Sequence, residues 1–292
     1  MAWDEPVRKW ALNAPTMTRD RQKIWIAAAA ALALVICYWA TLRGMVNQWS
    51  VDEDMSHGFA VPFVIAWIVW RDRKRLQALN PSPSAWGFVM LAGAAAVQII
   101  SSLGLGLFAA SVAFLVSLVG VTLCLGGFAY LRALAFPFAL SLFMLPKLAI
   151  VYNQTTLPLQ LLASRLASSS LALVGYKVLR EGVILDVGGH RVSVAEACSG
   201  VRYLLSLAFI AVVFAYMTGA KPSMRWLLLI ASIPVAILAN AIRVAVSAAV
   251  PALDSGTPHE AAGAAVFVLC LILIFAVERL FHPYFSPREA QS

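Results

Sequence analysis

The feature that most constrains the fold of this chain is its series of apolar runs, most of which are long enough to cross a lipid bilayer. Hydrophobic residues make up 61% of the 292 residues and charged residues only 12%, whereas a soluble domain is roughly half apolar and about a quarter charged. One globular core cannot enclose so large an excess of apolar side chains. The composition therefore predicts an all-α, polytopic membrane protein.

The positions of these runs predict about eight transmembrane helices. The first run, 24–42, is too long for the core of a signal peptide and is expected to be an uncleaved span. The run over 59–70 is short and would cross the bilayer only if tilted or extended by its flanks. The span over 133–151 is expected to be broken by Pro137 and Pro146. The full set of expected spans is 24–42, 59–70, 86–103, 105–125, 133–151, 197–218, 226–250 and 259–281.

Two segments are expected to lie outside the bilayer core. In 154–175, polar side chains alternate with leucines at helical spacing. This pattern favours an amphipathic helix at the membrane surface, with a polar-faced span as the alternative. In 182–194, Gly188-Gly189 stands between β-branched residues and predicts a small extracytoplasmic β-hairpin.

The distribution of basic residues predicts the orientation. Lys and Arg total 22 and the net charge is +8, but most of these residues flank apolar runs, where they act as topology signals and attract anionic lipid. No nucleic-acid partner is therefore expected. Basic residues concentrate in cytoplasmic loops, so the cluster in 71–75 and the basic N-terminal tail place the N-terminus in the cytoplasm. We expect cytoplasmic tails over 1–22 and 283–292 around one transmembrane domain over 23–282, with the hairpin outside.

Among the four cysteines, Cys198 alone has polar neighbours. Cys37, Cys124 and Cys270 lie inside apolar runs, where a thiol acts as a small hydrophobe. No CxxC pair or zinc-site spacing occurs, so no disulfide framework, metal or cofactor is expected. Cys198 lies in the first turn of a predicted helix, where the helix dipole favours a thiolate. Arg202, four residues later, projects from the same helical face.

Arg243 is a permanent cation within an apolar run, where a charge is costly and usually faces the interior of a helical bundle. Asn240, three residues earlier, lies on the same face and would orient the guanidinium. Two interpretations stay open. Either Arg243 snorkels or pairs with Glu196 or Glu260, or it stabilises the thiolate of Cys198 or the oxyanion formed when a carbonyl is attacked.

His259 opens the last expected span and is the candidate general acid and base, because histidine is the usual proton carrier at neutral pH. Alternatively, it is an ordinary interfacial residue. His57, beside the acidic stretch 52–54, is a rival base, and His190 and His282 are weaker candidates. A Cys and His pair supports acyl transfer. The residues alone thus predict an outward-facing membrane thiol enzyme, a protease or transpeptidase, with a non-enzymatic component of polysaccharide export or a transporter as the alternative.

Three short motifs occur in an order that resembles the exosortases and the related archaeosortases. They are Ala195-Glu-Ala-Cys-Ser-Gly-Val-Arg202, Ala239-Asn-Ala-Ile-Arg-Val244 and His259-Glu-Ala-Ala-Gly263. Two further stretches are similar to motifs of that family, namely Trp49-Ser-Val-Asp52 with Ser56-His-Gly-Phe59-Ala-Val-Pro62, and Arg180-Glu-Gly182 before the hairpin. The resemblance covers roughly residues 25 to 280, which is nearly the whole chain.

The resemblance implies a bacterial inner-membrane cysteine protease or transpeptidase whose active site lies on the outer face. Cys198 matches the nucleophile of the family, Arg243 its arginine and His259 its histidine. The residues expected to support them are Asn240, Arg202, Glu196 and His57.

The implied substrates are secreted proteins with a C-terminal tripartite sorting signal of the PEP-CTERM type, which consists of a Pro-Glu-Pro motif, a transmembrane segment and a basic tail. The new carboxyl group would pass to water or to an unknown amine at the cell surface. Members of the family are linked to exopolysaccharide production and biofilms. Basic residues expected on the outer side, such as Arg180, Arg191 and Arg202, are hypothesised to meet the acidic signal motif.

Overall fold

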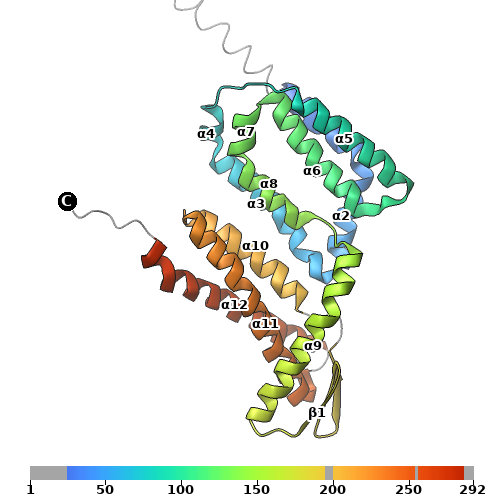
Figure 1. Cartoon of the computed structure of the whole chain (residues 1–292), viewed down its shortest axis with the longest axis vertical. Coiled ribbons are helices and arrows are strands. Elements are labelled where there is room, and N and C mark those ends of the chain that lie inside the picture. Colours follow the sequence, from blue (N-terminus) through green and yellow to red (C-terminus); the bar gives the residue numbers. More distant parts are fainter. Residues whose placement is uncertain (1–24, 195–199, 254–255, 286–292) are drawn as a thin grey trace, which may run out of the picture. The chain divides into compact units, whose positions relative to one another are not determined.

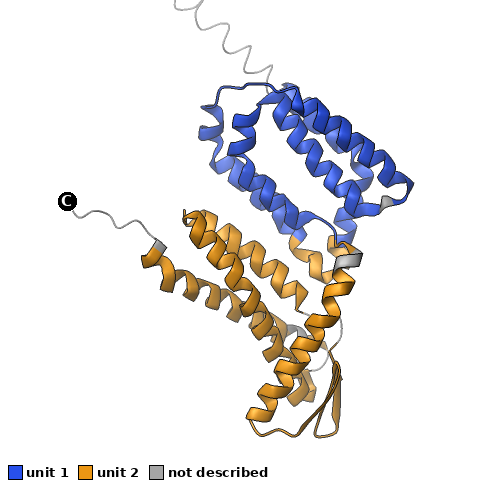
Figure 2. Ribbon diagram, viewed as in Figure 1, with its two compact units in different colours: residues 1–48, 58–146 blue, residues 49–57, 147–292 orange. Residues whose placement is uncertain are grey.

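The computed structural model describes residues 25–194, 200–253 and 256–285 (Figure 1). These residues are mostly helical, with one small antiparallel sheet. The chain divides into two compact units (Figure 2). Unit 1 consists of Met1–Gln48 and Gly58–Pro146, and unit 2 of Trp49–His57 and Lys147–Ser292.

Unit 1 is built around a helical hairpin, α5 (Trp86–Ile100) and α6 (Gly106–Leu125). Its two helices can approach closely because Gly87 has no side chain. A Cβ at this position would lie only 2.6 Å from the carbonyl oxygen of Gly120. The other elements that contribute residues to this unit are a helix over Trp25–Cys37, α2 (Trp39–Val51), η1 (Glu53–Phe59), α3 (Ala60–Arg71), α4 (Arg73–Gln77), η2 (Ser101–Leu105), α7 (Phe128–Ala133), α8 (Ala135–Ser141) and η3 (Leu142–Met144).

Unit 2 is organised around the long helix α11 (Pro222–Ala249), which packs against three other helices and the sheet (Figure 1). Its amphipathic pattern explains this central position, because small residues such as Ala236, Ala239 and Ala248 are buried against its neighbours. The remaining elements of the unit are α9 (Ala149–Leu173), β1 (Val178–Glu181), β2 (Ile184–Val187), β3 (His190–Ser193), α10 (Val201–Met217), η5 (Pro251–Leu253) and α12 (Gly256–Phe285).

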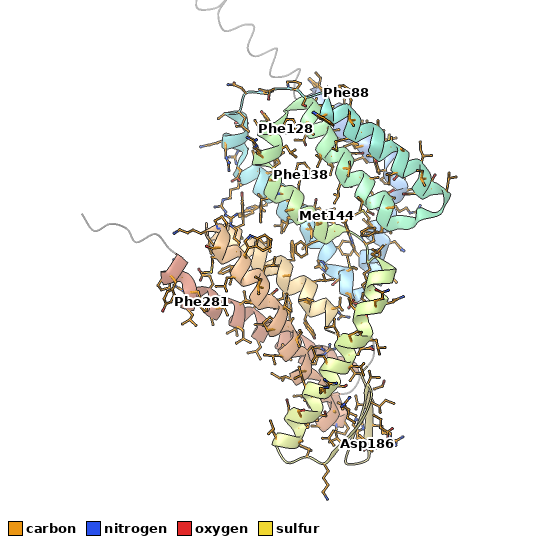
Figure 3. The ribbon with its side chains drawn as sticks, in the orientation of Figure 1. Phe88, Phe128, Phe138, Met144, Asp186 and Phe281 are labelled. Atoms are coloured by element: carbon orange, nitrogen blue, oxygen red, sulfur yellow. The ribbon has the colours of Figure 1, made fainter. Side chains whose placement is uncertain are left out.

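The predicted hairpin at Gly188-Gly189 is confirmed, and it belongs to a three-stranded antiparallel sheet in the order β1-β2-β3. Both turn glycines have positive φ, as a tight hairpin of this type requires. Asp186, labelled in Figure 3, accepts a hydrogen bond from the Gly189 amide at 2.9 Å and so closes the turn. The sequence analysis missed strand β1, because its residues are almost all exposed and show no alternation of polar and apolar side chains.

The expectation of about eight spans is not confirmed. Among the described residues, four helices are long and apolar enough to cross a membrane, namely Trp86–Gly104, Gly106–Leu125, Pro222–Ala249 and Gly256–Tyr284. A fifth span would require Trp25–Cys37 and Trp39–Val51 to act together, although they are bent by 70°. Helix α3, on the expected span over 59–70, has 12 residues and is only about 18 Å long.

The span expected over 133–151, with breaks at Pro137 and Pro146, is broken at Pro146 in the structure. Helix α8 and the turn η3 end before Leu145, whose backbone is extended, and α9 begins only at Ala149. The physical reason is Pro146, because a proline disfavours helical geometry in the residue that precedes it. The helix expected over 154–175 is part of α9, which buries Ala163 and Ala167 in the core of unit 2. Its location at the membrane surface stays a prediction.

Candidate active site

A pocket of about 490 Å³ lies within unit 2, where the starts of α10 and α12, the C-terminal part of α11 and the turn η1 meet. Its wall combines charged, hydroxyl and apolar side chains, which suits a peptide with both polar and apolar parts. The lining residues are Glu53, Ser56, Arg202, Tyr203, Ser206, Arg243, Gly256, Gly263, Ala264 and Phe267.

Arg243 lies on α11 in the wall of this pocket, and only 8% of its surface is exposed. Its guanidinium carbon lies 5.5 Å from the centre of the Tyr203 ring, within the range of a cation–π contact. Asn240, one turn earlier on α11, is 1% exposed. The charge expected inside a helical bundle is therefore found in a buried position at a pocket.

Two glycines let α10 and α12 approach α11 at this point. Gly200 precedes α10 with a φ of 85°, and a Cβ there would lie 3.1 Å from the side chain of Asn240. A Cβ at Gly263 of α12 would lie 3.0 Å from the Tyr203 hydroxyl oxygen and 3.6 Å from the guanidinium of Arg243. The Tyr203 hydroxyl donates a hydrogen bond to the Gly263 carbonyl at 3.3 Å. The three helices thus meet around the Arg243 guanidinium.

The acidic turn η1 is bound to the start of α9 by a buried cluster of charged and hydroxyl groups. The Lys147 ammonium donates hydrogen bonds to Asp52 at 2.8 Å and to Asp54 at 2.6 Å. The Tyr152 hydroxyl donates to Asp54 at 2.7 Å. The sequence analysis noted the acidic residues but missed these partners. No local pattern signals them, because Lys147 is 93 residues from Asp54 along the chain.

The carboxylates of this cluster stabilise the protonated forms of Lys147 and Tyr152. Burial lowers the pKa of the Lys147 ammonium, but the hydrogen bonds and charges of Asp52 and Asp54 outweigh it, so the net pKa lies above its ordinary value. Burial and the hydrogen bond to Asp54 raise the pKa of the Tyr152 phenol. Lysine and tyrosine therefore both keep their protons at neutral pH, and the cluster holds η1 in a fixed position.

Arg202, in the first turn of α10, connects this cluster to the pocket. Its Nη2 donates to the carboxylate of Glu53, and its Nε lies 3.7 Å from Oδ1 of Asp54. The two carboxylates differ in exposure, with 74% of the Glu53 side chain exposed but only 8% of the Asp54 side chain. Arg202 and Arg243 thus contribute two guanidinium groups to one pocket.

The other predicted site residues are described only in part. Cys198 and Glu196 lie outside the described residues. His259 lies in α12, four residues before Gly263, and its side chain is not described. The His57 ring lies on η1 with its centre 6.3 Å from that of Phe209 on α10. The catalytic roles of all these residues stay predictions.

The two weaker histidine candidates lie elsewhere. His190 begins strand β3, and Nδ1 of His282 lies 2.9 Å from the Glu278 carboxylate near the end of α12. In the described part of the chain, no group of three or more His, Cys, Asp or Glu residues has an arrangement that could hold a metal ion.

Comparison with known proteins identifies the family. Neither a search of curated proteins nor a search of solved structures found a match. A family model described as Transmembrane exosortase (Exosortase_EpsH) matches residues 49–276. This range contains η1, the sheet and the pocket, together with the motifs around Cys198, Arg243 and His259. The match extends over more than half of the chain, which is therefore a membrane protein that belongs to the transmembrane exosortase family.

Proposed function

We propose that this protein is a membrane-embedded cysteine peptidase or transpeptidase that cleaves C-terminal sorting signals of exported proteins. Cys198 is the nucleophile, His259 the general acid and base, and Arg243 the cation that stabilises negative charge. The observation that carries the proposal is the meeting of α10, α11 and α12 around the buried guanidinium of Arg243.

Chain connectivity supports the assignment of all three residues to one site. Cys198 is two residues before Gly200, and two residues span at most about 7 Å. Gly200 packs against Asn240, which is one turn from Arg243 on α11. Position 259 is one turn before Gly263 on α12, and residues four apart lie on the same face of a helix. Each motif is thus next to a residue in contact with the Asn240–Arg243 face.

The proposed chemistry is acyl transfer. The Cys198 thiolate attacks the scissile carbonyl and a tetrahedral intermediate forms, whose oxyanion is stabilised by a fixed cation such as Arg243. Collapse of this intermediate forms a thioester and releases the C-terminal fragment, whose new amine takes a proton from His259. Water or a surface amine then attacks the thioester, gives a proton to His259, and regenerates the Cys198 thiolate.

The substrate reaches this site by lateral diffusion. A protein held by one transmembrane segment moves in the plane of the bilayer and presents the peptide before that segment at the membrane boundary. We place the active site on the outer face of the bacterial inner membrane, with both termini in the cytoplasm. Basic residues in 71–75, on α3 and α4, support this orientation through the positive-inside rule.

The test follows a tagged reporter that ends in a short acidic motif, an apolar segment and a basic tail. Cys198→Ala and His259→Ala are expected to abolish its processing, observed as a gel shift, and Arg243→Gln to reduce it at least about a hundredfold. Cys37→Ala is the matched control, because it removes an exposed thiol from unit 1, and its processing rate should equal that of the unmodified protein.

Processing that persists in Cys198→Ala would rule out the thiol mechanism and favour a non-enzymatic role in polysaccharide export or transport. Mass spectrometry of the reporter processed by the unmodified protein identifies the acceptor from the mass of the mature C-terminus. A free carboxylate indicates hydrolysis, whereas an added amine indicates transpeptidation.

A further inference from the structure

The ion pair between Glu53 and Arg202 joins two residues with very different surroundings at the entrance of the pocket. Glu53 is on the turn η1, and 74% of its side chain is exposed. Arg202 is on α10, and 31% of its side chain is exposed. The carboxylate of Glu53 accepts a hydrogen bond from the Arg202 guanidinium. An exposed ion pair of this kind contributes little to stability, because water competes for both partners.

The two edges of the Arg202 guanidinium face different kinds of carboxylate. On one edge, Nε lies 3.7 Å from Oδ1 of Asp54, which is within ion-pair range but longer than a hydrogen bond; Asp54 is buried and also binds Lys147 and Tyr152. Replacing Asp54 would break this whole cluster. The Nη2 edge meets Glu53, which lies on the surface. Arg202 is therefore anchored on one side and offers its other side to a carboxylate that can be exchanged.

The rest of the pocket wall suits a peptide whose carboxylate binds at this edge. Ser56 and Ser206 contribute hydroxyl groups, and Ala264 and Phe267 of α12 form an apolar wall. Arg243 adds a second guanidinium deeper in the wall. An arginine fork binds a carboxylate through two parallel hydrogen bonds, which an amide of the same shape cannot match.

We propose that Glu53 is an internal placeholder, whose carboxylate occupies the site on Arg202 that an acidic side chain of the substrate takes when it binds. The pocket thereby selects a glutamate or aspartate close to the scissile bond, and Glu53 competes with it. This inference rests on the proposed function for its substrate class, but the binding step itself does not require the Cys198 thiol.

The experiment therefore measures binding in the Cys198→Ala background, in detergent micelles. The probes are two labelled peptides with the same C-terminal signal sequence, one with a single glutamate in its acidic motif and one with glutamine there. In the Cys198→Ala protein with no second substitution, the glutamate peptide should bind at least about threefold more tightly than the glutamine peptide. Adding Glu53→Gln should tighten binding of the glutamate peptide about two- to fivefold and leave the glutamine peptide unchanged.

Three further variants test whether Arg202 causes the preference for the glutamate peptide. Arg202→Gln should bring the two affinities within about twofold of each other, and Arg202→Lys should retain part of the preference, because lysine keeps the charge without the fork. Glu181→Gln is the matched control, because this exposed glutamate of β1 does not line the pocket. It should change neither affinity. Thermal unfolding confirms that each variant is folded.

The proposal is wrong if Glu53→Gln shifts both peptides equally or neither, or if the preference for glutamate survives Arg202→Gln. These outcomes are distinct from failure of the proposed function. If the Cys198→Ala protein still processes the reporter while the glutamate peptide responds to Glu53→Gln as expected, the acid-binding site is supported and the thiol mechanism is wrong.

Discussion

At the scale of single residues, Gly200 shows why the motif around Cys198 has a glycine. Its φ of 85° is in the left-handed region, where a side chain is strained, and a Cβ there would lie only 3.1 Å from the side chain of Asn240. The backbone at the start of α10 is therefore positioned directly on the helix that holds Arg243. A side chain at position 200 would move either this backbone or Asn240.

We expect Gly200→Ala to lower the rate of reporter processing about tenfold or more, because displacements of reacting groups below 1 Å already reduce rates strongly. Left-handed strain should also lower stability by about 1–2 kcal/mol. Gly219→Ala is the matched control, because Gly219 follows the other end of α10 with a φ of 69° and a Cβ there meets open space. The control should show a similar stability loss with normal processing, and equal processing rates in the two variants would contradict the positioning role of Gly200.

At the scale of elements, the short turn η1 depends on its partners for a fixed position. A seven-residue 3-10 helix is too short to be stable alone. Within the turn, the Asp54 amide donates to the Asp52 carboxylate at 3.0 Å. The links from Asp52 and Asp54 to Lys147 and Tyr152 then hold η1 against α9. These links place Glu53 at the pocket and Asp54 beside Arg202.

Lys147→Met is expected to destabilise the detergent-solubilised protein by about 2–3 kcal/mol, since it leaves two partly buried carboxylates without their cation. The pH dependence follows from the raised pKa of Lys147. Its stabilisation is fully present below the ordinary lysine pKa of about 10.4 and is lost only as the pH rises through the still higher folded-state value. The difference in Tm between the two proteins should therefore be constant from about pH 7 to about pH 9.5 and shrink only above that range.

The control for this experiment is Lys177→Met, which removes an exposed lysine just before β1. It should leave the Tm nearly unchanged, as is usual for a surface substitution. If the Lys147→Met difference already fades between pH 7 and pH 9, burial outweighs the two carboxylates, and the cluster is not the ion pair described above.

At the scale of the whole molecule, the chain leaves unit 2 after His57 and returns to it at Lys147. The Asp54–Lys147 ion pair therefore joins the chain just before and just after the longer segment of unit 1. The four apolar helices identified by length and composition divide evenly between the two units. Each unit thus has its own pair of helices able to cross a bilayer.

The proposed orientation predicts which surfaces water-soluble reagents reach. In a background without the four native cysteines, Ser193→Cys on the exposed face of β3 should react with a membrane-impermeant maleimide in intact spheroplasts. Lys74→Cys on α4 should react only after the membrane is permeabilised, because the basic stretch 71–75 is expected on the cytoplasmic side. The two positions lie on opposite sides only if the chain crosses the bilayer an odd number of times between them, so this expectation takes α5, α6 and the broken apolar segment over 133–151 as three crossings. Both positions are exposed in the structure. The reverse labelling pattern would invert the orientation and place the sheet in the cytoplasm.

Features with a local physical cause could be predicted from the sequence alone. The hairpin at Gly188-Gly189 follows from glycine conformation, and the helical hairpin of α5 and α6 follows from long apolar runs that meet at Gly104. The break before α9 also has a local signal, Pro146, which the sequence analysis identified. The burial of Arg243 followed from the cost of a lone charge in an apolar run.

Features that depend on contacts between distant segments were decided only by the tertiary structure. The edge strand β1 exists because β2 pairs with it, and the partners of Asp54 and Glu53 lie on other elements far along the chain. Hydrogen bonds and ion pairs act over only a few ångströms, and no periodic pattern records which distant residues come that close. The sequence by itself therefore determined the family, the apolar helices and the candidate residues, whereas the tertiary structure decided that η1 lines the pocket and that Glu53 meets Arg202 there.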